Sequence, residues 1–408
     1  MHGLDRTHGS GLLGGLIALY VLFLPIQVPL TSDFRLAPSD LFLLLFLLVG
    51  LGRIRLHPWA WSPWLLGLVP LFAMGTLVTA VTWGSVRLQV LLQKDLGLLL
   101  LMSSYAVITD WASSWARIRC LIRLLVGTVA LNNLAALIDF GLGAMGFFHL
   151  DWLNYSTHRL AGLLVDPNAY GGLLALTLVL HLTTPSVPSG ERTSPGLSWV
   201  GFLDLLITLS LTAGLLLTFS RSAWLGMAAA CAIALSLERR LLLRLLPSAL
   251  LAGGLVLTIL GPGFLDVIVA MSSRSSQVTS RLDYILTALG HVSESPLWGV
   301  GLGFHAARYG WIIHNTTVWF LAEFGLIGLL LFAGFAIWFA AVAWDGASRT
   351  EGSERSLLLG LLLGHAAMLG LSLGIEALYQ RHWWLVLGLI AASRPLLTER
   401  AAPTGVTA

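Results

Sequence analysis

Apolar runs as long as a bilayer crossing make up most of this chain. A transmembrane helix needs about 17–25 consecutive apolar residues, and we divide the sequence into twelve such runs, of which the second and the eighth are short. The runs cover approximately residues 11–30, 38–52, 63–82, 88–109, 117–138, 161–183, 199–218, 222–237, 241–262, 315–344, 355–375 and 379–395. The sequence therefore predicts an all-α polytopic membrane protein with about twelve transmembrane helices, or ten or eleven if two runs form a re-entrant pair.

The composition agrees with this fold class. Of the 408 residues, 57% are hydrophobic and only 11% are charged, which is about half the charged fraction of a soluble protein. The 16 Trp suit the two membrane interfaces. Cys120 and Cys231 both fall in apolar runs, so no disulfide framework is expected. Residues 11–30 lead directly into further runs, which argues against a cleavable signal peptide.

The distribution of arginine predicts the orientation of the chain in the membrane. With the N-terminus in the cytoplasm, the cytoplasmic helix ends hold 14 arginines and the opposite ends hold eight, in the sense of the positive-inside rule. Both termini are then cytoplasmic. Residues 1–262 contain the first nine transmembrane helices, residues 263–314 form an extracytoplasmic loop, and residues 315–408 contain the last three helices and a cytoplasmic tail.

The eight arginines on the outer side need an explanation, because the positive-inside rule predicts few of them. They are Arg35, Arg87, Arg159, Arg221, Arg274, Arg281, Arg308 and Arg381. Each either reaches the interface or pairs with a nearby acid, or it binds an anion. Arg221 favours an anion, because it lies between two apolar runs with no acidic residue close in sequence. Since guanidinium groups donate paired hydrogen bonds to phosphate oxygens, a diphosphate would suit a cluster of arginines.

Lys94 is the only lysine of the chain and lies in the outer half of the fourth run. A charge at that depth is either paired or functional. Arg87 lies seven residues earlier, on the same helical face, and two cations on one face indicate an anion inside the bundle. A structural pair between Lys94 and an aspartate on another helix explains the lysine equally well.

The extracytoplasmic loop is predicted to contain a short amphipathic helix over residues 281–293. Ser280 and Asp283 have the spacing of a capping box, with Asp in place of Glu. Apolar residues then recur at helical spacing and form a stripe that can lie on the membrane surface. Arg281 would occupy the first turn, where the helix dipole disfavours a cation, which indicates an external anion unless the side chain is merely solvated. Tyr284 of the same helix is a further candidate contact to a substrate.

His314 is the candidate catalytic residue. It stands at the outer mouth of the tenth run, directly before Asn315 and two threonines that are candidate helix N-caps. The positive end of that helix and the nearby arginines would lower the pKa of the imidazole and keep it neutral. A neutral imidazole can accept a proton as a general base. The alternative is a hydrogen-bonded polar group without a chemical role, which is the usual state of a histidine in a membrane protein.

The order of motifs from Arg281 to Gly328 resembles the O-antigen ligase and polymerase family. An arginine opens a helix, the pattern Pro-x-x-Gly-x-Gly-x-Gly follows, and His-Asn then precedes an apolar helix containing Glu-Phe-Gly-Leu-Ile-Gly. The segment TFSRSAW around Arg221 fits the same family. The resemblance covers about residues 160–345, and the flanking runs match by hydropathy alone.

This resemblance implies roles for individual residues. Arg221 and Arg281 would hold a carrier diphosphate, and His314 would activate the acceptor hydroxyl, with Asn315 beside it in the substrate site. Arg159 and Asn168 match the family's Arg-x-x-Gly…Pro-Asn element and would line the same cavity, unless they only cap and orient the sixth helix.

The resemblance also implies a reaction. It points to a GT-C-like glycosyltransferase of the bacterial inner membrane that needs no metal or cofactor and faces the periplasm. The donor would be a glycan on polyprenyl (undecaprenyl) diphosphate, and direct displacement would invert the anomeric configuration. In an O-antigen ligase of lipopolysaccharide biosynthesis the acceptor is a sugar of lipid A–core, whereas in a polymerase it is a second lipid-linked repeat unit. The modest loop at 263–314 and the total length favour the ligase.

Other functions fit the sequence less well. The sequence contains no His-Glu-x-x-His, Cys-x-x-Cys or Asp-x-Asp, so no metal site is expected. The net charge of +3 is spread over membrane loops and does not indicate nucleic acid. A secondary transporter would also have about twelve helices, but the two halves show no obvious repeat and the charges gather on one face. The expected partners are the lipid bilayer, the glycan donor and the lipid A–core acceptor, and the protein is expected to be a monomer.

Overall fold

The computed structural model describes residues 5–29, 35–50, 52, 54–55, 57–83, 94–153, 159–184, 199–261 and 275–401. The α-helices are α1 (Asp5–Leu22), α2 (Pro38–Gly50), α3 (Pro63–Leu66), α4 (Leu68–Trp83), α6 (Leu96–Trp111), α7 (Trp115–Ala144), α8 (Pro167–Thr183), α9 (Trp199–Leu217), α10 (Arg221–Leu237), α11 (Arg239–Leu260), α13 (Ser275–Val292), α14 (Phe304–Tyr309), α15 (Thr316–Ser348), α16 (Gly352–Ser372) and α17 (Arg381–Ala401). Two 3-10 helices are η2 (Pro58–Ala60) and η4 (Gly162–Leu164).

Every predicted apolar run contains a helix. Six segments of the described chain are helical, long and apolar enough to cross a membrane: Pro63–Thr82, Trp115–Ala144, Trp199–Leu217, Arg239–Thr258, Thr316–Ser348 and Gly352–Ser372. Shorter apolar helices cover Gly11–Leu22, Pro38–Gly50, Leu96–Trp111 and Arg221–Leu237. The chain is therefore a polytopic helical protein. The predicted all-α class misses one antiparallel pair of two-residue strands, β1 (Val28–Pro29) and β2 (Arg35–Leu36), which joins the segments before α2.

Several helices begin at other residues than predicted, and two of these differences bear on the candidate site. The sixth run was expected from residue 161, but α8 begins at Pro167, because proline has no N–H to donate and suits the first helical position. The loop helix begins at Ser275 rather than at 281. Ser280 is therefore inside α13, beyond the first turn, where the backbone N–H groups already have partners within the helix and need no cap. The predicted capping box with Asp283 is wrong, and Arg281 is the seventh helical residue rather than part of the first turn.

Polar contacts join the helix ends on two faces of the bundle. One set connects the starts of α2, α8, α10, α15 and α17 with the neighbouring loops, and we call this the site face. Its contacts include Arg381–Asp40, Arg159–Asn168, Asn168–Ser220 and Asn315–Leu373. The other set lies at the opposite ends of the helices, on what we call the opposite face. Its contacts include His57–Asp110, Arg244–Leu182, Arg355–Glu238 and Arg394–Trp59.

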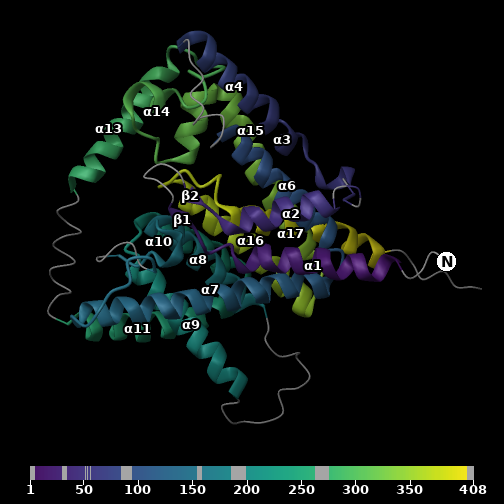
Figure 1. The fold of residues 1–408 in the computed structure, drawn as a ribbon, viewed down its shortest axis with the longest axis vertical. Helices are drawn as coiled ribbons and strands as arrows, with labels where there is room; N and C mark the ends of the chain where they lie inside the picture. The colour runs from purple at the N-terminus through teal and green to yellow at the C-terminus, as the bar shows by residue number, and fades with distance from the viewer. Residues whose placement is uncertain are drawn as a thin grey trace, which may run out of the picture.

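The core of the bundle is built from α8, α10 and α16, which pack on one another (Figure 1). Almost every residue of α8 is buried. A Cβ atom at Gly226 of α10 would lie 2.4 Å from the carbonyl oxygen of Ala367 on α16, and one at Gly370 would lie 2.8 Å from the Cα atom of Gly226. Such close backbone approach is the usual way for helices to pack in lipid. Helices α13 and α14 lie away from this core, beside α4 and α15 (Figure 1).

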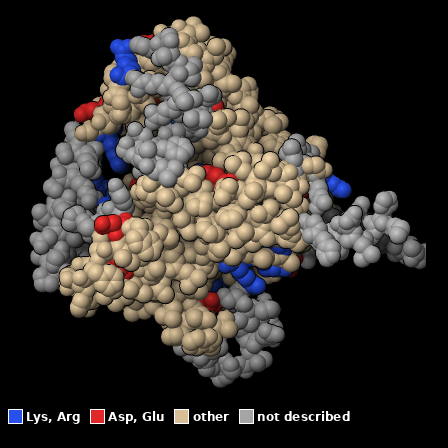
Figure 2. Space-filling view, viewed as in Figure 1, with Lys and Arg blue, Asp and Glu red and all other residues tan. Residues whose placement is uncertain are grey.

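The surface and the packing of the N-terminal helices suit a lipid environment. Most of the face seen in Figure 2 carries no charged side chain, and Lys and Arg gather in a few places.

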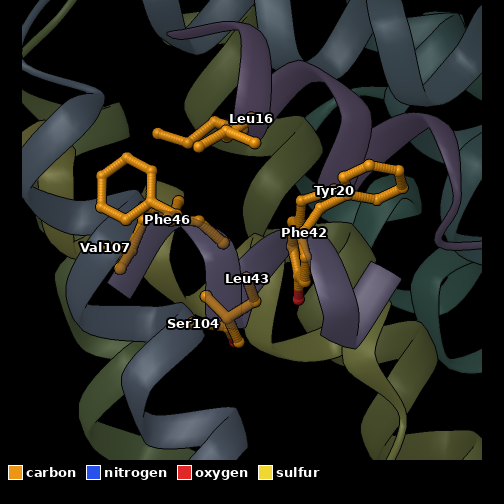
Figure 3. A pocket seen from close by; sticks show the side chains of 9 residues that line it. Leu16, Tyr20, Phe42, Leu43, Phe46, Ser104 and Val107 are labelled. Carbon is orange, nitrogen blue, oxygen red and sulfur yellow. The ribbon is translucent and has the colours of Figure 1, made fainter. Parts of the chain in front are cut away.

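Between α1, α2 and α6, the side chains of Leu16, Leu43, Phe46 and Val107 surround a gap of about 10 Å³ (Figure 3). An apolar gap of this size is too small to hold a ligand, so this part of the bundle serves packing.

The glycine-rich turn is clamped between two transmembrane helices. Helix α15 is broken at Gly325, whose φ is 66°, and the turn lies against the break: the N–H groups of Val300 and Gly301 donate to the carbonyls of residues 322 and 323. On its other side, Leu302 donates to the carbonyl of Gly75 on α4 at 3.0 Å. The turn therefore approaches the backbones of both α4 and α15 closely.

Alanine at these glycines should lower the thermal stability of the protein in detergent. A Cβ atom at Gly299 or at Gly325 would lie 2.3 Å from backbone atoms of the opposite segment, and φ is positive at both residues. We expect Gly299→Ala and Gly325→Ala to cost about 1 kcal/mol for the backbone conformation and a further 1–3 kcal/mol, roughly, for the steric clash. Gly310→Ala is the control, because its φ is also positive and nothing lies within 4 Å. Equal shifts of the melting temperature in all three variants would contradict the clamp.

Candidate active site

Three helix N-termini lie on the site face. Asp166 caps α8 by accepting from the N–H of Asn168 at 2.9 Å, Ser220 caps α10, and Asn315 caps α15 by accepting from the N–H of Val318 at 3.0 Å. The hydroxyl of Ser220 donates to the amide oxygen of Asn168 at 3.0 Å, which ties the starts of α8 and α10 together. Since the N-terminus of a helix carries partial positive charge and free N–H groups, this meeting point favours an anion.

Arg159 is held in this junction by two hydrogen bonds. Its Nη2 donates to Oδ1 of Asn168 at 2.8 Å, and its Nε donates to the carbonyl oxygen of Thr218 at 2.8 Å. Asn168 therefore accepts from both Arg159 and Ser220, while its own amide donates to Asp166 at 3.2 Å. The two residues that the sequence placed together are in direct contact. Asn168 orients Arg159 by accepting its hydrogen bond. The structural role that the sequence left open for Asn168 is therefore observed.

The backbone is strained directly before two of the three caps. Val165 has a φ of 65° and Phe219 a φ of 46°, and they are the only non-glycine residues with positive φ in the part of the chain that the structure describes. Val165 precedes the cap Asp166, and Phe219 precedes the cap Ser220. A bulky residue in this conformation costs of order 1–3 kcal/mol and is found chiefly where function requires it. The strain therefore makes the starts of α8 and α10 candidates for a functional site.

His314 lies half-buried beside this junction, directly before the cap of α15. Burial lowers the pKa of its imidazole, the charge of Arg281 lowers it further, and the charge of Asp166 raises it. These effects place Arg281 of α13 and the cap of α8 close to His314 in space, although they are distant in sequence. The predicted lowering of the pKa of His314 is confirmed in direction, with burial as the largest cause and an arginine as the second.

Arg221 is the first residue of α10 and is exposed. A cation at the first position of a helix lies in the unfavourable field of the helix dipole. The sequence predicted that Arg281 would be in the first turn of a helix. In the structure Arg221 is in a first turn, and Arg281 is not. Its position directly after Ser220 places its backbone next to the contact between Ser220 and Asn168.

Stacked aromatic rings carry α13 and therefore Arg281. The ring of Tyr284 stacks on Trp311 with a centroid distance of 4.4 Å and an angle of 9°, and Trp311 also contacts the ring of His305 at 5.1 Å. Tyr284 lies one turn after Arg281, so the stack fixes the face of α13 that presents the arginine. A side chain that the sequence proposed as a substrate contact is engaged with the protein's own Trp311.

A buried carboxylate anchors this aromatic cluster to the bundle. Glu323 of α15 accepts from the N–H of Gly303 at 2.7 Å, from the indole N–H of Trp319 at 2.7 Å, and lies 3.1 Å from Nδ1 of His305. The side chains of both Glu323 and His305 are at most 4% exposed. The carboxylate thus links the start of α14 to the first half of α15. His305 in turn contacts the ring of Trp311, so the aromatic stack is connected to Glu323.

Lys94 has a protein partner. Its Nζ forms a salt bridge with Glu376 in the loop between α16 and α17, and lies 5.0 Å from the ring of Trp319 and 4.7 Å from that of Tyr379. Of the two explanations given by the sequence, the pair across helices is the one observed, with a glutamate as the partner. The other residue of the predicted pair of cations, Arg87, lies outside the described residues.

Asn315 uses both ends of its amide within the protein. Its oxygen caps α15, as predicted, and its nitrogen donates to the carbonyl of Leu373 at 3.0 Å. Thr316 next to it donates to the carbonyl of Ile375 at 2.9 Å. These bonds fasten the start of α15 to the end of α16 and so fix the segment that carries His314.

Several site residues escaped sequence analysis. Thr218 and Ser220 hold Arg159 and Asn168, and Glu323 and Glu376 satisfy buried polar or charged groups. Ser220 had a usable signal, because a serine directly before an apolar run is a typical N-cap. Glu323 had one as well, since an acid inside an apolar run requires partners. In the described part of the chain, no three His, Cys, Asp or Glu side chains gather as a metal site would require.

A comparison with known families finds a match in this region. Residues 206–333 match the model of the O-antigen ligase family. This segment of the chain is similar to an O-antigen ligase domain. The predicted resemblance is confirmed, and the matched segment includes Arg221, Arg281, His314 and Glu323, whereas Arg159 and Asn168 precede it. Members of this family are lipid-linked glycan transferases of the ligase or polymerase type. None of the curated proteins compared with the chain matches it.

Removing either partner of the Lys94–Glu376 pair should destabilise the protein without a direct effect on anion binding. Their side chains are 17% and 9% exposed, and breaking a buried pair costs about 3–5 kcal/mol, less where water reaches the charges. We expect Lys94→Met and Glu376→Gln each to lower the melting temperature in detergent, and the double variant to regain most of the loss because no charge remains unpaired. A double variant that melts no higher than the single variants would return Lys94 to the list of anion-binding residues.

Proposed function

We propose that this protein is an O-antigen ligase, which transfers a glycan from polyprenyl diphosphate to a sugar of lipid A–core. The observation that carries the proposal is the junction of the starts of α8 and α10, where Asn168 holds Arg159 and where α10 begins with Arg221. The half-buried His314 belongs to the proposed site because Arg281 and Asp166 both act on its pKa. A diphosphate needs several hydrogen-bond donors and positive charge in one place, and a hydroxyl acceptor needs a base beside it. We propose that the arginines meet the first requirement and His314 the second.

The proposed reaction is a single displacement at the anomeric carbon. The acceptor hydroxyl oxygen forms the new bond to the anomeric carbon, and the bond from that carbon to the diphosphate oxygen breaks, with its electron pair leaving on the diphosphate. His314 takes the proton of the hydroxyl. Arg221 and Arg281 stabilise the negative charge that grows on the leaving group, which is where fixed charges contribute most to catalysis. The configuration at the anomeric carbon is inverted.

The proposed arrangement in the membrane follows the arginine distribution and the two sets of helix-end contacts. Twelve helices cross the bilayer in a GT-C-like bundle, with both termini in the cytoplasm and the site face in the periplasm of the bacterial inner membrane. Residues 1–262 and 315–408 then form the transmembrane part, and 263–314 form the periplasmic loop. Arg55, Arg240, Arg355 and Arg394 lie on the opposite face or in its loops, which agrees with a cytoplasmic placement.

The stripe of exposed leucines on α13 supports placing this helix at the periplasmic membrane surface. Leu282, Leu286 and Leu289 are 53%, 58% and 41% exposed and recur at helical spacing. The same helix carries Arg281 toward His314, so it would hold the arginine at the level of the lipid head groups. This is the depth at which the diphosphate of a membrane-anchored donor lies.

Lipopolysaccharide from a deletion strain separates the two members of the family. If the protein is a ligase, gel analysis should show that all long chains are lost from lipid A–core while lipid-linked polymer accumulates. Complementation with the wild-type gene should restore the ladder. A strain that retains a single repeat unit on the core would identify a polymerase instead.

Replacement of His314 should affect turnover and leave donor binding intact. We expect His314→Ala to lower the transfer rate by about 10²–10⁴-fold, while Arg281→Ala should weaken donor binding as well. The wild-type rate should fall on the acid side with a midpoint below about pH 6.5, the ordinary pKa of histidine, because the pKa of His314 is lowered and the neutral form is the base.

The charge of Asp166 gives this pH dependence a specific control. Asp166 raises the pKa of His314, so Asp166→Asn should move the acid midpoint to still lower pH, and asparagine keeps the helix cap. Asp283→Asn removes the same charge from an exposed position of α13 and should leave the midpoint unchanged. An unmoved midpoint in Asp166→Asn, or normal turnover in His314→Ala, would remove His314 from the role of base.

A further inference from the structure

A cavity on the opposite face has the chemistry of an anion site. Its volume is about 300 Å³, and it lies where the end of α8, the junction of α10 and α11, and the start of α16 come together. Arg240 and Arg244 of α11 and Arg355 of α16 line it, together with Glu238 and Ser356. The helices α8 and α10 start at the candidate active site and reach this cavity at their other ends, so the two sites are distinct.

The salt bridges of the cavity leave an excess of positive charge. Arg355 pairs with Glu238 at 3.5 Å, and Arg244 donates to the carbonyl oxygen of Leu182 at 3.3 Å, a neutral partner. Within the described part of the chain, no carboxylate pairs with Arg240 or Arg244. Arg240 and Arg244, one turn apart on α11, therefore line a cavity whose one carboxylate, Glu238, already pairs with Arg355. A phosphate group is the ligand that such a pair of forks binds best.

The surface next to the arginines is that of a helix against lipid tails. Leu243, Leu246 and Leu250 of α11 are 72%, 62% and 70% exposed. Leu243 lies between Arg240 and Arg244 in the sequence, and Leu246 and Leu250 follow the two arginines along α11. A ligand with its phosphate in the cavity and its chains along these leucines would satisfy both the charged and the apolar part of this surface. A free anion would use only the first.

We propose that this cavity binds the phosphate of an anionic phospholipid, such as phosphatidylglycerol, at the cytoplasmic surface of the membrane. Basic pockets between transmembrane helices are a known form of head-group site. The lipid would join α11 to the start of α16 and to the end of α8. Because α8, α10 and α16 form the core that carries the caps of the active site, a bound lipid would stabilise that core from its far end.

The test is a lipid titration of the purified full-length protein in a neutral detergent. Dioleoyl-phosphatidylglycerol is compared with phosphatidylcholine of the same chains and with inorganic phosphate, and the melting temperature is recorded at each concentration. The variant Arg240→Gln/Arg244→Gln is compared with Arg239→Gln/Arg119→Gln, which loses the same charge from the same end of the bundle without touching the cavity. No glycan transfer is measured, so the result does not depend on the proposed function.

Phosphatidylglycerol should raise the melting temperature of the wild type and of the control variant equally. In Arg240→Gln/Arg244→Gln the concentration for half the effect should rise at least about tenfold, since two charge-assisted hydrogen-bond donors are lost. Equal responses in both double variants, or an equal effect of phosphatidylcholine, would overturn the proposal. A shift by inorganic phosphate at the same concentrations would overturn the lipid assignment in favour of a free anion. If the double variant does not accumulate, the two single variants provide the same comparison.

Discussion

The buried carboxylate of Glu323 is the interaction on which the placement of the candidate site depends. It accepts hydrogen bonds from Gly303, Trp319 and His305, and at this buried position an unpaired carboxylate would be costly. These bonds hold the start of α14 against the first half of α15. The glycine turn, the break at Gly325 and the stack under α13 all follow from this attachment.

A second constraint is the electrostatic field at the starts of α8, α10 and α15. Three helix N-termini and several arginines in one place repel one another unless an anion is present. Here Asp166 provides one negative charge, as the cap of α8 and as a neighbour of His314. The arginines and the strained residues Val165 and Phe219 are the features on which the proposed diphosphate site rests.

The sequence predicted the helical elements well where a single residue or a simple period determines them. Apolar runs located a helix in every predicted span, and the family resemblance found Arg221, Arg281 and His314 in the region that matches the O-antigen ligase model. It failed at α13, where a capping pattern at Ser280 was real in spacing but lay inside a longer helix. A local pattern shows only that a helix could start at a given residue. The actual start also depends on whether the residues before it remain helical, as they do in α13.

Composition and hydropathy by themselves determined that the chain is a helical membrane protein, because apolar length is a property of consecutive residues. For the same reason, the order of short motifs predicted the family that residues 206–333 match. Only the tertiary structure decided which polar groups meet. In the structure Lys94 pairs with Glu376, Arg159 donates hydrogen bonds to Asn168 and Thr218, and the charge of Arg281 acts on His314. Partners from distant helices are chosen by packing and by the cost of leaving a charge unpaired in an apolar interior, and neither is written in the spacing of residues along the chain.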